Sequence, residues 1–154
     1  MYLTQSLHRS VQQHPERPAI RAGALVRSYR ELAERVARLA GALQTLGMQP
    51  GDRVAMLALN SERYMEYQFA VPWGGGALNP CNIRWSAAEI LYSLDDCAST
   101  ILLVDDTWVS GGRALSAVHC LRDAGASSVS VLSIARWLSF DFIRPPSSGS
   151  ISEL

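Results

Sequence analysis

The sequence of 154 residues contains no lysine, and all 14 of its basic residues are arginine. A P-loop NTPase binds phosphates with a lysine in its glycine-rich loop, so that class is excluded for this chain. The 14 basic residues are balanced by 14 acidic ones, which gives a formal net charge of +0. Neither nucleic acid nor an anionic membrane surface is therefore an expected partner.

Cysteine and histidine are also scarce, with three of each, and no C-x-x-C pair is present. Their spacing fits neither a zinc site nor a disulfide framework, so we expect reduced thiols and no metal site. No apolar run reaches the ~18 residues of a membrane span. The N-terminus lacks a charged segment followed by an apolar one, so a cytoplasmic protein is expected. The residues concerned are Cys81, Cys97, Cys120, His8, His14 and His119.

What the sequence does contain is an alternation of strand and helix patterns. Strands are expected at 19–21 and 25–27, which pair as a hairpin, and then at 53–59, 101–104 and 128–134. Helices are expected between them and at 113–123. The nearly continuous apolar run at 53–59 is typical of a strand covered on both faces. We predict an α/β fold, a three-layer sandwich with a mainly parallel sheet.

Four side chains are placed to begin helices. Thr4 and Ser61 are candidate N-caps, while Ser28 with Glu31, and Ser86 with Glu89, form capping boxes. Gly47 is expected to end the second helix in a left-handed conformation, and Gly74-Gly75-Gly76 to reverse the chain. Each of the three helices that follow Ser28, Ser61 and Ser86 has an apolar face that is expected to point inward. These faces consist of Leu32, Val36, Leu39, Leu43 and Leu46 in the first helix, Tyr64, Met65, Phe69 and Trp73 in the second, and Ile90, Leu91 and Leu94 in the third. Arg30, Glu34, Arg35 and Arg38 are expected to form a solvated face.

The stretch 101–113 carries the candidate site. A short apolar strand ends in Asp105 and Asp106, a Ser110-Gly111-Gly112 turn follows, and a helix is expected from Arg113. Ligands of open α/β sheets bind beyond the carboxyl ends of strands. A glycine-rich turn before a helix N-terminus favours a phosphate. The simpler interpretation of the two carboxylates is a solvated strand end that caps the next helix.

Several blocks of the sequence resemble one enzyme family. They are Ser28-Tyr29-Arg30-Glu31-Leu32, Gly51-Asp52-Arg53-Val54-Ala55, Asn60-Ser61, Tyr67 and the run from Leu78-Asn79-Pro80 to Asp95-Asp96. In this order and spacing they resemble the amino-terminal subdomain of AMP-forming acyl-CoA synthetases, most closely the fatty-acyl and medium-chain branch. The resemblance covers about residues 3–106. It implies an enzyme that uses ATP, Mg²⁺ and coenzyme A to activate a carboxylate.

That family's phosphate loop, which ends in a lysine, is not found in this chain, nor is its later catalytic lysine. No catalytic residue is therefore carried over. The resemblance implies a truncated synthetase that contributes scaffold and is inactive alone, because the reaction needs cations that neutralise the negative charge of the triphosphate.

Residues 101–138 resemble a second family, the type I phosphoribosyltransferases, through the pattern of four apolar residues, two acids, three variable residues and Ser-Gly-Gly. By this resemblance Asp105 and Asp106 would bind ribose hydroxyls, and the backbone of Ser110, Gly111 and Gly112 a 5′-phosphate. The ligand would be phosphoribosyl pyrophosphate (PRPP) or a ribose phosphate, with Mg²⁺.

The domain division that follows has three parts. Residues 1–106 are synthetase-like, 101–138 phosphoribosyltransferase-like, and 139–154 a disordered tail. The fold is then incomplete relative to either parent family. A third hypothesis is a non-catalytic interaction fragment that self-associates through an open sheet edge.

Overall fold

The structure, a computed structural model, describes residues 3–105, which form four helices and five strands. Parallel strands with helical crossovers confirm the predicted α/β class. In none of the described helices are the length and apolar character sufficient to cross a membrane. In chain order the elements are α1 (Gln5–Gln13), β1 (Pro18–Ala22), β2 (Leu25–Ser28), α2 (Tyr29–Thr45), β3 (Arg53–Ala58), α3 (Glu62–Trp73), β4 (Ala77–Cys81), α4 (Ala87–Asp96) and β5 (Ser99–Asp105).

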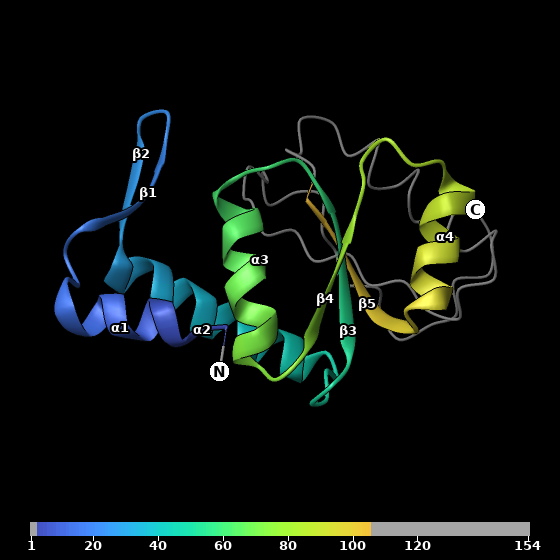
Figure 1. Ribbon diagram of the computed structural model, residues 1–154, viewed down its shortest axis with the longest axis horizontal. Coiled ribbons are helices and arrows are strands. Elements are labelled where there is room, and N and C mark those ends of the chain that lie inside the picture. Colours follow the sequence, from blue (N-terminus) through green and yellow to red (C-terminus); the bar gives the residue numbers. More distant parts are fainter. Residues whose placement is uncertain (1–2, 106–154) are drawn as a thin grey trace, which may run out of the picture.

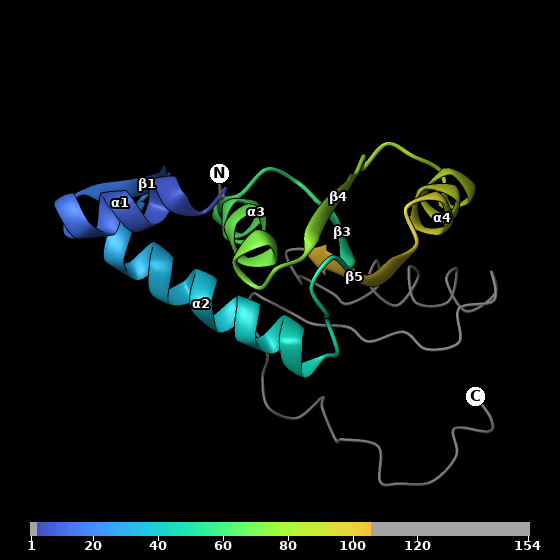
Figure 2. The ribbon, with the colours of Figure 1, turned by 60° about the horizontal axis from the view of Figure 1, so that its bottom comes forward.

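The central sheet has three parallel strands in the order β4-β3-β5. Val54 of β3 is in register with Leu78 of β4 and Ile101 of β5. Helices α2 and α3 lie on one side of this sheet and α4 lies on the other (Figures 1 and 2). The three-layer arrangement is thus as predicted. The β1–β2 hairpin, paired antiparallel, stands apart from the sheet beside α1 and α2 (Figure 1).

All four helices begin directly after the expected residue, and the capping hydrogen bond is confirmed at three of these four positions. Both capping boxes are complete, with Ser28 and Glu31 at α2 and Ser86 and Glu89 at α4. Ser61 accepts a hydrogen bond from the Tyr64 amide at the start of α3. Thr4 precedes α1, but its side chain makes no capping hydrogen bond. Its backbone is already helical (φ −81°, ψ −8°), whereas a capping side chain normally stands on an extended residue.

The core forms mainly between β3, α2 and α3. In β3 the side chains of Val54, Ala55, Met56 and Ala58 are buried, as expected for a strand covered on both faces. The buried residues of α2 are Leu32, Val36, Leu39, Ala40 and Leu43. Leu46, predicted to point inward, is 46% exposed. It follows the last residue of α2, and the chain turns at Gly47 (φ +101°), so Leu46 lies past the packed surface.

The buried face of α3 differs from the prediction. Met65 is 41% exposed, while Glu66 and Tyr67 beside it are buried. Tyr64, Phe69 and Trp73 pack against the core only in part. The apolar pattern misplaces the face because Glu66, a charged residue, takes a core position through ion pairing. In α4 no residue is buried, and Ile90, Leu91 and Leu94 are only half-buried among the described residues, contrary to the prediction.

Gly74-Gly75-Gly76 is the predicted chain reversal between α3 and β4. All three amides donate to carbonyls of the end of α3, namely those of Ala70, Pro72 and Val71. A Cβ on Gly76 would lie 3.0 Å from side-chain atoms of Met48 and Val71. The run is therefore packed and internally hydrogen-bonded, which leaves it no amide to offer a phosphate. The elements predicted at 113–123 and 128–134 and the tail 139–154 lie outside the described residues.

Candidate functional site

The carboxyl ends of β3, β4 and β5 share one edge of the sheet. The chain leaves β3 toward α3 on one face and leaves β4 toward α4 on the opposite face (Figure 2). In α/β proteins, ligands bind beyond the carboxyl ends of the strands, in the region where connections leave toward opposite faces of the sheet. Asn60 and Ser61 follow β3, Asn82 and Ile83 follow β4, and Asp105 ends β5. This edge is the site that the topology defines.

A buried hydrogen-bond network holds the strands beneath this edge. The Tyr67 hydroxyl donates to the Val54 carbonyl at 2.8 Å and accepts from the Asn79 amide at 3.1 Å. Burial raises the pKa of Tyr67, so its phenol stays neutral and able to donate. It thereby joins α3 to β3 and β4 at one buried point.

The side chain of Asn79 extends the network to the other face of the sheet. Its Nδ2 donates to Ser99 Oγ at 2.9 Å and to the Ser93 carbonyl at 3.3 Å. Ser93 Oγ donates in return to Asn79 Oδ1 at 3.3 Å. The amide thus ties β4 to α4 and β5, and it compensates for the small apolar contact that α4 makes.

Two side chains with potential reactivity, Cys81 and Tyr64, lie near the carboxyl end of β4. Burial raises the pKa of both groups. The Cys81 thiol donates a weak hydrogen bond to the Asn79 carbonyl at 3.9 Å, and the Tyr64 ring lies edge-to-face on Tyr67. A protonated, buried thiol is a poor nucleophile, so Cys81 is a packing residue. Cys81 and Cys97 are free, as predicted.

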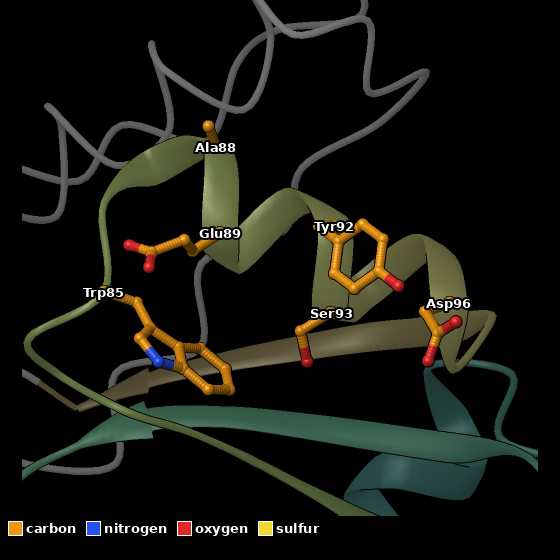
Figure 3. Close-up of a pocket in the computed structure, with 6 residues that line it drawn as sticks. All are labelled: Trp85, Ala88, Glu89, Tyr92, Ser93 and Asp96. Carbon is orange, nitrogen blue, oxygen red and sulfur yellow. The ribbon is translucent and has the colours of Figure 1, made fainter.

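A groove of about 490 Å³ runs along α4 (Figure 3). Its residues stand in two rows at helical i, i+4 spacing, which places them on one face. Trp85, which precedes the helix, and Asp96 lie at opposite ends (Figure 3). Among the described residues, two aromatic rings, two carboxylates, a hydroxyl and a methyl group line it, and none of these lining side chains is basic. The rows are Trp85, Glu89 and Ser93, and Ala88, Tyr92 and Asp96.

The sequence-predicted site is described only at its beginning. Asp105 is the last residue of β5 and is in register with Ala58 at the carboxyl end of β3. Its predicted position at a strand end is thus confirmed. Asp106, Ser110, Gly111 and Gly112 lie outside the described residues. Within residues 3–105, no three His, Cys, Asp or Glu side chains are grouped as a metal site requires.

One buried charge was missed by the sequence analysis. Glu66 of α3 is 2% exposed and forms a two-pronged ion pair with Arg35 of α2, Arg35 Nη2 lying 3.0 Å from Glu66 Oε2. Arg27 Nε lies 4.0 Å from the same carboxylate. Arg35 was expected on a solvated face, but it is half-buried instead. The cluster joins β2, α2 and α3, and its charges face one another, so we assign it to structure.

A parallel sheet with helices on both faces defines the α/β class of domain, in which ligands bind at the carboxyl ends of the strands. A family model described as AMP-binding enzyme matches residues 7–142. The chain belongs to this family. The match continues through the stretch 101–138 that resembles phosphoribosyltransferases. A comparison with curated proteins gives no match.

Comparison with solved structures also finds proteins whose fold is similar to that of this chain. A protein of Rhodopseudomonas palustris assigned as a long-chain-fatty-acid CoA ligase is 25% identical, with a TM-score of 0.72 over 89% of this chain and 34% of its own. The N-terminal subdomain of Klebsiella oxytoca NpsA, bound to 3-hydroxybenzoyl-AMSN, is 26% identical, with a TM-score of 0.64 over 69% of this chain and 27% of its own.

A benzoate CoA ligase of Burkholderia xenovorans, 20% identical, shares the fold with a TM-score of 0.72 over 86% of this chain and 26% of its own. The chain therefore spans about a third or less of the length of these relatives.

Proposed function

We propose that this chain is part of an AMP-forming acid–CoA ligase of the fatty-acyl or medium-chain branch, and that it contributes scaffold without adenylation chemistry of its own. The match of the AMP-binding enzyme model to residues 7–142 carries the family part of the proposal. The similarity to a protein assigned as a long-chain-fatty-acid CoA ligase supports the branch.

Three observations support the view that residues 3–105 take no part in binding a nucleoside triphosphate. Adenylation needs cations that neutralise the triphosphate and the negative charge that develops in the transition state. The chain has no lysine that could supply such a cation. The amides of Gly74, Gly75 and Gly76 are already hydrogen-bonded to the end of α3. Of the half-buried arginines, Arg35 is paired with Glu66, and Arg27 lies 4.0 Å from the same carboxylate. No residue of 3–105 is therefore proposed to act on ATP.

The direct test is acid-dependent exchange of pyrophosphate into ATP by the purified chain. Octanoate, palmitate, benzoate and acetate serve as substrates, and a no-protein blank sets the baseline. We expect no exchange above this blank. Exchange with any of the four acids would overturn the claim that the chain contributes scaffold alone.

A second experiment tests the scaffold part with a positive readout. Residues 7–104 would replace the equivalent segment of the Rhodopseudomonas palustris relative, and pyrophosphate exchange by the chimera would be measured. If the segments are equivalent, the chimera keeps exchange activity. A Met56→Asp version places a charge at a fully buried position of β3 and should lose it. A folded chimera without activity would contradict the proposal.

The second candidate function is binding of a ribose phosphate by Asp105, Asp106 and the Ser110-Gly111-Gly112 backbone. What favours it is the position of Asp105 at the carboxyl end of β5, followed by that motif in the sequence. Three or four charge-assisted hydrogen bonds, less the entropy of association, correspond to a dissociation constant near ~1 mM.

Phosphorus-detected NMR titration of ribose 5-phosphate and PRPP with Mg²⁺ tests it. The Asp105→Asn/Asp106→Asn variant should bind more weakly than the parent. Absence of saturation by ~10 mM, or equal binding by the variant, would leave the two aspartates as strand-end carboxylates.

A further inference from the structure

The groove along α4 combines aromatic surface with unbalanced negative charge. Trp85 and Tyr92 are 37% and 70% exposed, which is unusual for side chains of this size. Glu89 and Asp96 line the same groove, and Asp95 precedes Asp96 in the last turn. The sequence of α4 contains no basic residue, and none of the ion pairs among residues 3–105 involves these carboxylates. Within residues 3–105, the side chains that line the groove therefore carry a net negative charge and have no ion-pair partner.

The position of Asp95 and Asp96 increases this imbalance. Both lie in the last turn of α4, where the helix dipole presents its negative end and favours cations. Each carboxylate there is disfavoured by the dipole and by its neighbour. A cation at this end of the groove would relieve both interactions at once.

The other end of the groove offers Glu89 and Trp85. Glu89 Oε2 accepts hydrogen bonds from the amide and hydroxyl of Ser86, which keeps the carboxylate ionised and fixed. The rings of Trp85 and Tyr92 present faces on which an alkyl chain or a guanidinium packs well. Figure 3 shows the tyrosine between the two carboxylates.

We propose that this groove binds an extended basic peptide segment of a protein partner, with one arginine or lysine at Asp96 and a second at Glu89. We choose a basic peptide as the ligand because its positive charge complements the negative charge of the groove. Glu89 and Asp96 are seven helical residues apart, about 10.5 Å at 1.5 Å per residue. In an extended peptide of the polyproline II type, with three residues per turn and a rise of about 3.1 Å per residue, residues i and i+3 lie on the same face about 9 Å apart. The partner motif is therefore basic–apolar–any–basic, and the proposal does not depend on ligase chemistry.

The test uses the full-length chain and the probe acetyl-Arg-Leu-Gly-Arg-amide, followed by the indole N–H signal of Trp85 in two-dimensional NMR. The signal is assigned with Trp85→Phe. We expect saturable binding, at least threefold weaker for Asp96→Asn and for Tyr92→Ala. Glu34→Gln removes an exposed charge from α2 and should leave binding unchanged, as a matched control. The isomer acetyl-Arg-Arg-Leu-Gly-amide should bind at least threefold more weakly than the probe.

Four results would overturn the proposal. They are absence of saturation, equal binding of acetyl-Glu-Leu-Gly-Glu-amide, equal binding of the two arginine isomers, and unchanged affinity in folded Asp96→Asn. A dimer in sedimentation that Tyr92→Ala dissociates would assign the groove to a second copy of the chain and would also overturn it. Circular dichroism of each variant confirms that the loss of binding is not a loss of folding.

Discussion

At the scale of single residues, Tyr67 has the most connected position in the core. Its hydroxyl bonds the backbone of both β3 and β4, and the side chain has no exposed surface. In Tyr67→Phe the Val54 carbonyl and the Asn79 amide lose this partner within the protein interior. The cost of leaving buried groups unsatisfied predicts a loss of about 1–3 kcal/mol in the free energy of unfolding, measured by urea denaturation.

Tyr92→Phe is the control for that change, because Tyr92 is largely exposed and its hydroxyl makes no hydrogen bond to the described residues. It should change the free energy of unfolding by less than about 0.5 kcal/mol. Equal effects of the two substitutions would mean that the Tyr67 hydrogen bonds contribute nothing specific.

Single residues also show which interactions can be predicted from nearby sequence and which cannot. The capping boxes of Ser28 and Ser86 were predictable because both partners lie within four residues. Glu66 was not, since its partner Arg35 is 31 positions away and only the packing of α3 on α2 brings them together. At the candidate site, Asp105 was placed correctly as a strand end, because the strand pattern itself is local.

At the scale of elements, α4 is held differently from α2. It buries no side chain, so its stability depends on its cap and on the hydrogen bonds of Asn79 and Ser93. Ser86→Ala removes the cap at a cost of about 1 kcal/mol. We expect amide hydrogen exchange in α4 to accelerate about fivefold, while that of α2 stays unchanged. Equal acceleration in both helices would show instead that α4 opens only with the whole domain.

The capping carboxylates make helix stability depend on pH. Hydrogen bonds from the Ser28 and Ser86 amides lower the pKa of Glu31 and Glu89. A carboxyl whose pKa is lower in the folded state stabilises the fold above its unfolded pKa of about 4.3, and this contribution is lost as pH falls through the folded pKa. Glu31→Gln and Glu89→Gln should therefore melt below the parent at pH 7 and approach it by about pH 3. A gap that persists at pH 3 would contradict this assignment.

The helices were predictable from the sequence because three of the four have a capping side chain and their apolar residues recur at helical spacing. Strand β4 was not predicted, because it follows a run of three glycines and contains Asn79 and Pro80, which are uncommon in strands. Which face of each helix is buried was harder to predict. The pattern placed Leu46 and Met65 inside, yet both are exposed, because periodicity reports which residues are apolar and not where the packing partner ends. For α4 the apolar pattern overestimates burial, because a pattern cannot show how closely a partner layer packs.

At the scale of the whole molecule, the two edges of the sheet differ. Strand β4 carries Pro80, which lacks an amide donor, and so resists pairing with another strand. Strand β5 is longer, has no proline, and has no partner on its outer side among the described residues. We predict concentration-dependent association in sedimentation, reduced by Thr100→Lys on β5. Thr45→Lys on α2 adds the same charge elsewhere and should leave association unchanged; equal effects would indicate charge repulsion alone.

The parallel pairing of β3 also bears on how the chain is made. Its two partner strands follow about 25 and about 45 residues later, so β3 leaves the ribosome well before either neighbour exists. At about 5–20 residues per second, the interval before β5 emerges is about 2–9 s. During that time a run of buried residues from Val54 to Met56 is without cover. The nascent chain should therefore be a chaperone client in that window, and slower translation after β3 should increase its aggregation.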